Sequence, residues 1–216
     1  KLYPDIITFA FWCRKANISK KKIDFFNGKV RLGLGLVFHI TPSNVAINFA
    51  YSFVFGLLSG NANIVRLPSR IFPQVDIICS AINKLFGLKK YLELKKMNTF
   101  IRYDQNDEIT SKFSENANAR VIWGGDSTIR AIKKLPSPER SIDLTFADRY
   151  SICIIKSNEL LKLDKKKLSL LGKGFFNDTY LMDQNACSSP HLIIWLGENN
   201  EIAKEKFWST IFNIAK

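Results

Sequence analysis

The sequence has little of what metal centres and membrane anchors require. Four cysteines and two histidines occur in 216 residues, no two cysteines are spaced as Cys-x-x-Cys, and no histidine stands at metal-ligand spacing from a cysteine. We therefore expect no metal site. The most apolar run, residues 45–58, is too short to span a bilayer and is interrupted by Asn48 and Ser52. It predicts a buried helix and no membrane insertion.

A secretory signal pattern is also missing from the first residues. The expected compartment is therefore the cytoplasm, where the cysteines remain free thiols. The chain begins at Lys1 rather than at a methionine, and its last predicted helix, residues 201–215, runs almost to the final residue. We expect the chain to be a fragment of a longer protein.

Negative charge is scarce, with 19 acidic against 32 basic residues and a net charge of +13. An apolar content of 46% with 17 phenylalanines nevertheless excludes a disordered chain. A basic balance is compatible with nucleic acid, a membrane surface or a polyanionic ligand. The lysines lie in scattered groups and no nucleic-acid recognition motif accompanies them, so they predict a solvated surface that also attracts phosphorylated ligands, and no nucleic-acid partner.

Short apolar runs alternate with helical patterns along most of the chain. After a first helix at 4–17, strands are expected at 34–40, 62–67, 99–103, 120–123, 141–146 and 151–156. Helices are expected between them at 43–58, 72–86, 108–115 and 127–134. Repeated strand–helix units of this length predict an α/β fold in three layers, with a mostly parallel, Rossmann-like sheet covered by helices on both faces.

The pattern changes after residue 157. A helical stretch at 160–176 is followed by a polar loop at 177–190, a strand at 192–196 and the last helix. We predict one domain over residues 1–157 and the beginning of a second α/β domain over residues 158–216.

Glycines offer two candidate phosphate sites. Gly33 and Gly35 begin a Gly-x-Gly-x-x-Gly pattern, but Phe38 occupies the third glycine position, so that motif fails. Gly124 and Gly125 follow a strand and precede a helix that Asp126 is expected to cap. Free amides and the helix dipole favour an anion at such a turn. An ordinary strand-to-helix turn remains the alternative.

One cysteine differs from the others in its surroundings. Cys187 stands among small and polar neighbours, whereas Cys13, Cys79 and Cys153 lie in apolar stretches and are predicted to be small core hydrophobes. Cys187 is therefore the candidate reactive thiol, with a structural thiol as the alternative. His191 is interpreted as a residue at the entry of a strand rather than as the partner of Cys187.

Asn44 closes the sequence that follows the first buried strand. Ligands of open parallel sheets gather at the carboxyl ends of the strands, and a side-chain amide there can donate a hydrogen bond to a developing oxyanion. Alternatively, Asn44 or Ser43 only caps the next helix. Local sequence leaves both roles open.

Taken in order, these segments resemble the aldehyde dehydrogenase superfamily. Residues 34–44 are similar to its strand followed by Pro-x-Asn, 60–69 to its "GN…KPS" segment, 124–128 to its nucleotide turn and 184–187 to its catalytic cysteine segment. The closer resemblance is to the LuxC-type long-chain fatty acyl-CoA reductases, the fatty acid reductases of bacterial luminescence. It covers nearly the whole chain and is carried by residues 11–17, 37–44, 146–151 and 184–190. Luminescence itself does not follow, because similar reductases occur in non-luminous bacteria.

The resemblance implies a nucleotide-binding domain at residues 1–157 and the beginning of a catalytic domain at residues 158–216. It makes Cys187 the nucleophile, and the Asn44 amide together with the Cys187 backbone N–H the donors to the oxyanion. The residues that it places at the cofactor are Thr41, Pro42, Ser43, Arg66, Pro68, Ser69, Arg70, Gly124, Gly125 and Asp126.

Two positions depart from the superfamily pattern. Leu67 replaces the lysine of "KPS", and Arg66 and Arg70 flank it, where they would meet a 2′-phosphate and favour NADPH over NADH. The superfamily's general-base glutamate falls near Phe146. Because that glutamate activates water, its absence suits an enzyme that exchanges acyl groups with a thiol.

The implied function is the NADPH-dependent reduction of a long-chain fatty acyl-CoA, or an acyl-protein thioester, to a fatty aldehyde through a Cys187 acyl-enzyme. The implied partners are an acyl-protein synthetase and an acyltransferase, with a homo-oligomer for the full-length protein. Two alternatives remain at this point. One is an NAD(P)-dependent aldehyde dehydrogenase, and the other is a truncated nucleotide-binding module without catalytic activity.

Overall fold

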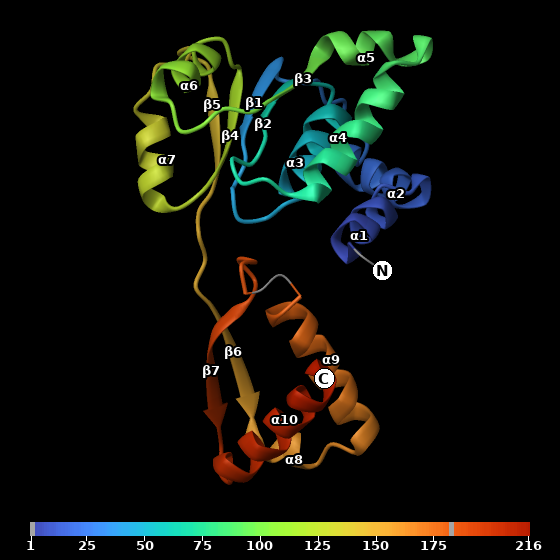
Figure 1. The fold of residues 1–216 in the computed structure, drawn as a ribbon, viewed down its shortest axis with the longest axis vertical. Helices are drawn as coiled ribbons and strands as arrows, with labels where there is room; N and C mark the ends of the chain where they lie inside the picture. The colour runs from blue at the N-terminus through green and yellow to red at the C-terminus, as the bar shows by residue number, and fades with distance from the viewer. Residues whose placement is uncertain (1–2, 182–183) are drawn as a thin grey trace. The chain divides into compact units, whose positions relative to one another are not determined.

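The computed structural model describes residues 3–181 and 184–216 (Figure 1). It divides into two compact units, Lys1–Ala147 and Asp148–Lys216. The boundary predicted after residue 157 falls inside α8 (Ser157–Leu161). The units separate before β6 (Ser151–Lys156) because β6 pairs with β7 (Pro190–Leu196) and not with the larger sheet.

The first unit contains a five-stranded sheet in the order β3-β2-β1-β4-β5, in which every neighbouring pair is parallel. Its strands are β1 (Leu36–Ile40), β2 (Ala62–Arg66), β3 (Asn98–Ile101), β4 (Ala119–Trp123) and β5 (Ile142–Phe146). The predicted parallel α/β architecture is confirmed. The chain runs outward from β1 through β2 to β3, then returns to place β4 on the other side of β1. The strand order therefore reverses between β1 and β4.

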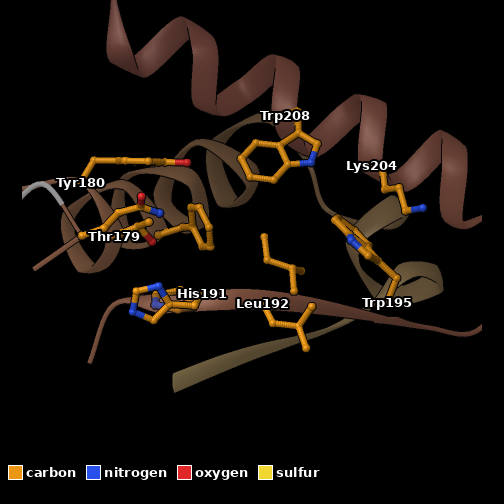
Figure 2. A pocket seen from close by; sticks show the side chains of 11 residues that line it. Thr179, Tyr180, His191, Leu192, Trp195, Lys204 and Trp208 are labelled. Atoms are coloured by element: carbon orange, nitrogen blue, oxygen red, sulfur yellow. The ribbon is translucent and has the colours of Figure 1, made fainter. Parts of the chain in front are cut away.

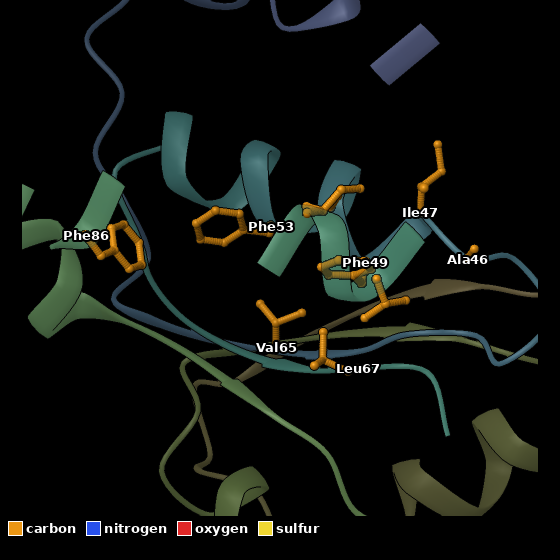
Figure 3. Close-up of a cluster of buried hydrophobic side chains, with 10 residues drawn as sticks. Ala46, Ile47, Phe49, Phe53, Val65, Leu67 and Phe86 are labelled. Atoms are coloured by element: carbon orange, nitrogen blue, oxygen red, sulfur yellow. The ribbon is translucent and has the colours of Figure 1, made fainter. Parts of the chain in front are cut away.

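Helices cover both faces of this sheet (Figure 1). The helices of this unit are α1 (Pro4–Trp12), α2 (Lys15–Phe26), α3 (Asn48–Leu58), α4 (Pro73–Phe86), α5 (Leu92–Met97), α6 (Asp107–Ser114) and α7 (Asp126–Lys133), with a 3-10 turn at Lys89–Tyr91. Of these, α3 and α4 lie on one face of the sheet and α6 and α7 on the other, whereas α1 packs on α3. Phe49 and Phe53 of α3 pack with Val65 of β2 and Val75 of α4 (Figure 3). On the other face, Phe38 and Ile40 of β1 pack against α6 and α7. The central strand β1 is thus buried on both faces, as its continuous apolar run predicts.

Several predicted boundaries are wrong. The helix expected at 4–17 is two helices, with a break at Cys13 and Arg14. The helix after β1 begins at Asn48 with Ile47 as its N-cap, so neither Ser43 nor Asn44 caps it.

Later in the chain, Gly125 and not Asp126 is the N-cap of α7; Asp126 is the first helical residue. The stretch at 160–176 is also two helices, α8 and α9 (Lys165–Thr179), because the Asp164 side chain accepts a hydrogen bond from the Lys167 amide and starts a new helix.

A buried polar cluster fastens α3 to the sheet. His39 of β1 is 1% exposed, with Nδ1 2.8 Å from Ser52 Oγ and Nε2 2.9 Å from Asn63 Oδ1. Asn63 Nδ2 donates to Asn98 Oδ1 at 2.7 Å, so Asn63 Oδ1 is an acceptor. His39 Nε2 therefore carries the proton and Nδ1 accepts from Ser52. A Cβ at Gly56 would collide with Asn63 Oδ1, which explains the glycine at this point of α3.

This cluster makes stability dependent on pH. Burial lowers the pKa of His39 to about 4, while its hydrogen bond to Asn63 acts in the opposite direction. An unfolded histidine titrates near 6.5, so between these values the unfolded chain binds a proton that the folded chain does not. Stability from His39 is therefore complete above about pH 6.5 and is lost as the pH falls towards 4.

We expect urea unfolding to show a loss of about 2–3 kcal/mol between about pH 7 and about pH 4.5, beyond the loss in a His39→Gln variant measured in parallel. The variant removes this titration, while the surface carboxylates titrate alike in both proteins. An equal loss in the two proteins would contradict the buried neutral histidine.

The second unit is built around the parallel pair β6 and β7, connected through α8 and α9 and followed by α10 (Asn200–Ala215). Phe175, Phe207 and Ile211 from α9 and α10 form a core against one face of the pair, where Ile193 and Trp195 lie. Side chains alternate along each strand, and Ile152 and Ile154 are about half exposed. None of the helices within residues 3–181 and 184–216 is long and apolar enough to cross a membrane.

Candidate active site

The predicted cofactor residues of the first unit gather at one edge of the sheet. Ile40, at the end of β1, lies opposite Arg66 of β2 and Ile122 of β4. The segments 41–44, 66–70 and 124–126 leave or follow the carboxyl ends of these three neighbouring strands. They therefore lie along the edge where parallel sheets bind ligands, beside the point at which the strand order reverses.

The segment after β1 is fixed at its start and exposed further on. Thr41 is buried, and its Oγ1 donates to the carbonyl oxygen of Arg66 at 2.6 Å. Pro42 is half-buried, whereas Ser43 and Asn44 are exposed. Asn44 lies outside α3, so the capping role considered for it is excluded. The other role considered, donation to an oxyanion, stays a prediction.

Arg66 is held at the end of β2. Its guanidinium lies 4.6 Å from the centre of the Tyr103 ring, and Nη2 donates to the Tyr103 carbonyl oxygen at 3.4 Å. Its Nε is buried and has no hydrogen-bond partner among the described residues. Pro68 is buried, while Ser69 and Arg70 are exposed, with Arg70 stacked 5.1 Å from the ring of Phe72. Arg70 is thus a second cation, four residues after Arg66, whose Nε lacks a partner among the described residues.

The turn between β4 and α7 presents backbone amides. Gly125 caps the helix without a side-chain hydrogen bond, and the Gly124 amide donates to the Phe146 carbonyl oxygen at 3.2 Å. A Cβ at Gly124 would lie 3.1 Å from Thr128 Cγ2, so glycine allows this tight approach to the helix. Asp126 is exposed in the first turn of α7 and is the acidic member of the set.

Together these groups fit a nicotinamide dinucleotide. Its phosphates need cations and N–H donors, and the edge supplies two arginines, the unpartnered Arg66 Nε and the first amides of α7. No three His, Cys, Asp or Glu side chains cluster as metal ligands in the part of the chain that the structure describes.

Cys187 is exposed on a short loop that is tied at several points within the second unit. Ser151 Oγ of β6 donates to the Cys187 carbonyl oxygen at 2.7 Å. Two residues on, Ser189 is fully buried, its Oγ donates to the Asp178 carbonyl oxygen at 2.8 Å, and its amide donates to the Ala186 carbonyl oxygen at 2.9 Å. The loop is therefore anchored to both β6 and α9 while its thiol faces solvent.

The other three thiols are placed differently. Cys79 packs against the core of the first unit and Cys153 against that of the second, and Cys13 is half-buried. Burial raises the pKa of the Cys13, Cys79 and Cys153 thiols. Since the thiolate is the nucleophilic form, burial disfavours nucleophilic chemistry at these positions.

Phe146 occupies the position at which the resemblance places a general base. It ends β5, is 44% exposed, and stacks on Trp123 with ring centres 4.0 Å apart and planes at 10°. An aromatic ring cannot take a proton from water, so this position supplies no base. Asn44 and Phe146 belong to the first unit and Cys187 to the second.

A pocket in the second unit was not predicted from the sequence. It has a volume of about 430 Å³ and lies between the end of α9, the strand β7 and the helix α10 (Figure 2). Its lining residues are Phe175, Thr179, Tyr180, Gln184, Pro190, His191, Leu192, Ile193, Trp195, Lys204 and Trp208. The large aromatic side chains around the Cys187 loop are the sequence signal from which it could have been suspected.

Residues 20–212 match the family described as acyl-CoA reductase (LuxC). The chain belongs to this family. The predicted LuxC-type resemblance is thus confirmed. The chain is 22% identical over 179 residues to a long-chain acyl-protein thioester reductase of Aliivibrio fischeri, a match that covers 79% of the chain and 35% of that relative. The chain therefore spans about a third of the length of this reductase.

Solved aldehyde dehydrogenases share the fold. A NAD-dependent benzaldehyde dehydrogenase from Corynebacterium glutamicum superposes with a TM-score of 0.66 at 17% identity, over 92% of this chain and 45% of that one. A putative aldehyde dehydrogenase, PutA, from Anabaena variabilis gives a TM-score of 0.62 at 18% identity, over 85% and 36% of the two chains. At these identities the likeness shows an aldehyde dehydrogenase-like fold.

Proposed function

We propose that this chain is the nucleotide-binding part, with the nucleophile loop, of an enzyme that reduces long-chain fatty acyl thioesters to fatty aldehydes with NADPH. The observation that carries the proposal is the exposed thiol of Cys187 on an anchored loop, in a chain of the acyl-CoA reductase family. The three other cysteines are half-buried, with raised pKa values, so Cys187 is the nucleophile of this proposal.

The first chemical step is acyl transfer to this chain. The Cys187 thiolate attacks the thioester carbonyl carbon, a new C–S bond forms, and the bond to the CoA sulfur breaks with release of the CoA thiolate. The backbone N–H of Cys187 donates to the oxyanion, and the family resemblance adds the side-chain amide of Asn44 as a second donor. One such donor contributes about 3 kcal/mol to the stability of the transition state. The exposed position of Asn44 outside α3 supports this role.

The remaining residues of the sheet edge bind and orient the cofactor. NADPH, when bound, supplies the hydride that reduces the acyl group. Arg66 and Arg70 would hold the 2′-phosphate, and the first amides of α7 would hold the pyrophosphate. Because Phe146 offers no base, water is not activated against the acyl-enzyme, and the acyl group leaves as aldehyde rather than as acid.

The acyl donor in this proposal is a CoA thioester or an acylated protein. The resemblance adds an acyl-protein synthetase and an acyltransferase as partners, and a homo-oligomer for the full-length enzyme. The name of the Aliivibrio fischeri relative, a long-chain acyl-protein thioester reductase, supports a fatty acyl thioester as the substrate class.

Cofactor consumption tests the function directly. The protein expressed from its whole reading frame should oxidise NADPH in the presence of tetradecanoyl-CoA and release tetradecanal and CoA. Oxidation of tetradecanal to the acid in the absence of CoA, with no reduction of tetradecanoyl-CoA, would instead identify an aldehyde dehydrogenase.

Arg70→Leu should weaken the preference for NADPH over NADH without lowering the rate with saturating NADH.

A further inference from the structure

The pocket of the second unit lies beside the nucleophile loop. Gln184 and Pro190 stand on either side of Cys187 in the sequence, and both line the pocket. The loop between them is anchored to α9 through Ser189 and to β6 through the Cys187 carbonyl group. A ligand in this pocket therefore has one end next to the segment that carries the thiol.

The lining changes in character along the pocket (Figure 2). Thr179, Tyr180 and His191 lie together at one end, Trp195 and Lys204 lie at the other end, and Trp208 lies between them. Gln184 belongs to the polar end, because its backbone N–H donates to the Thr179 carbonyl oxygen at 3.1 Å. The polar end is thus the end near the Cys187 loop, and the remainder is mostly aromatic and aliphatic.

The polar end of the pocket contains a hydroxyl group, that of Thr179, without a hydrogen-bond partner in the part of the chain that the structure describes. The residue is 1% exposed, and its Oγ1 is buried with no hydrogen-bond partner among the described residues. Buried hydroxyl groups in proteins are almost always hydrogen-bonded. Thr179 also lines the pocket, so the polar head of a bound ligand is a candidate partner for this hydroxyl.

Among the described residues, the apolar end of the pocket offers no unpaired charged group to a ligand. Lys204 Nζ already lies 2.6 Å from Glu201 Oε1 on the same helix, and Phe175, Ile193 and the two tryptophans offer hydrocarbon and ring surfaces. The volume of about 430 Å³ falls within the range of pockets that hold small ligands. The arrangement suits an uncharged chain with a polar head.

We propose that this pocket binds the alkyl chain of the fatty acyl thioester, with the thioester end beside Thr179 and the chain running towards Trp195 and Trp208. The assignment of the pocket rests on the proposed acyl reduction at Cys187. It makes the residues that line the pocket responsible for selectivity for the length of the acyl chain. Each methylene group moved from water into such a lining strengthens binding about fourfold. A long chain is thereby selected over a short one that leaves the aromatic end empty.

Filling the pocket tests the assignment. Ile193 faces the pocket and the helices, whereas Ile194, the next residue of β7, is not among the lining residues and serves as the matched control. Ile193→Phe should weaken binding of tetradecanoyl-CoA at least about tenfold, the loss of roughly two methylene groups, and leave butyryl-CoA unchanged. Ile194→Phe should leave both unchanged. Binding is followed through tryptophan fluorescence, since Trp195 and Trp208 line the pocket, and turnover through NADPH oxidation.

Thr179→Val provides a variant of nearly unchanged shape. Removing an unpaired buried hydroxyl should leave the melting temperature unchanged or raise it, and should weaken binding of tetradecanoyl-CoA about fivefold, the value of one hydrogen bond. Unchanged binding in both Thr179→Val and Ile193→Phe would overturn the proposal, as would an equal loss for the short and long substrates in Ile193→Phe.

The outcomes separate the pocket from the reaction. If the protein reduces both CoA esters and Ile193→Phe does not alter its preference for chain length, the pocket assignment fails and the proposed function stands. If the long ester binds with the predicted response to Ile193→Phe but no NADPH is oxidised, the proposed function fails and the pocket assignment stands.

Discussion

Replacing Cys187 by serine is expected to lower NADPH-dependent aldehyde formation by about a thousandfold or more in the full-length protein. A hydroxyl is a far weaker nucleophile than a thiolate, and in the proposed function no base activates it, because the superfamily's glutamate is predicted to fall near Phe146. Cys187 is exposed, so the substitution should not change the free energy of unfolding. Stopped-flow measurement of NADPH oxidation with tetradecanoyl-CoA gives the rate, and urea unfolding gives the stability.

Cys13→Ser is the matched control, since that thiol is half-buried and burial raises its pKa. It should retain the reductase rate. A Cys187→Ser protein that turns over at the wild-type rate would remove Cys187 from the mechanism, whatever the behaviour of the control.

Asp143→Ala is expected to destabilise the first unit by about 3–5 kcal/mol. Arg120 of β4 is 2% exposed, and its Nε and Nη2 donate to the two carboxylate oxygens of Asp143 on β5 at 2.7 and 2.8 Å. Its Nη1 donates to the carbonyl oxygens of Ile132 and Leu135, at 3.1 and 3.2 Å, and so ties the end of α7 to the sheet. Without Asp143, a buried cation loses its counter-ion.

Two comparisons isolate this effect in urea unfolding. Glu93→Ala removes the partner of Lys96 in an exposed pair and should change stability by less than about 1 kcal/mol. The double variant Arg120→Met, Asp143→Ala removes both charges and should recover much of the loss. A loss below about 1 kcal/mol in Asp143→Ala would show that the buried pair does not hold α7 and β5 to β4.

The architecture could be predicted because each parallel strand is a local signal. The strands β1 and β4 are mostly apolar and buried, with one polar residue each, His39 and Arg120, so hydrophobicity largely locates them. The start of α3 was misplaced for the same reason. Val45, Ala46 and Ile47 look like helix in sequence, but Ala46 and Ile47 pack into the core from a loop, and the helix starts only after them. Tertiary contacts there outweigh local propensity.

In the candidate site, too, locally signalled features could be predicted and features that depend on long-range contacts could not. Cys187 could be singled out because polar neighbours in sequence do indicate exposure, and the structure shows an exposed thiol. The unpaired Thr179 hydroxyl, and the pairing of Arg120 with Asp143, depend on contacts between elements far apart in the chain. The aromatic residues around the Cys187 loop hint at a pocket, but neither residue type nor spacing marks the contacts themselves, which explains why the sequence predicted neither the pocket nor the buried ion pair.

The central claim is that an acyl group passes through Cys187, and the mass of the protein tests it most directly. Incubating the full-length protein with tetradecanoyl-CoA in the absence of NADPH should add one tetradecanoyl group, which peptide mapping places on Cys187. Addition of NADPH should then remove the group as tetradecanal. An unmodified protein that still reduces tetradecanoyl-CoA, or an acyl group on Cys13, Cys79 or Cys153 instead, would contradict the account.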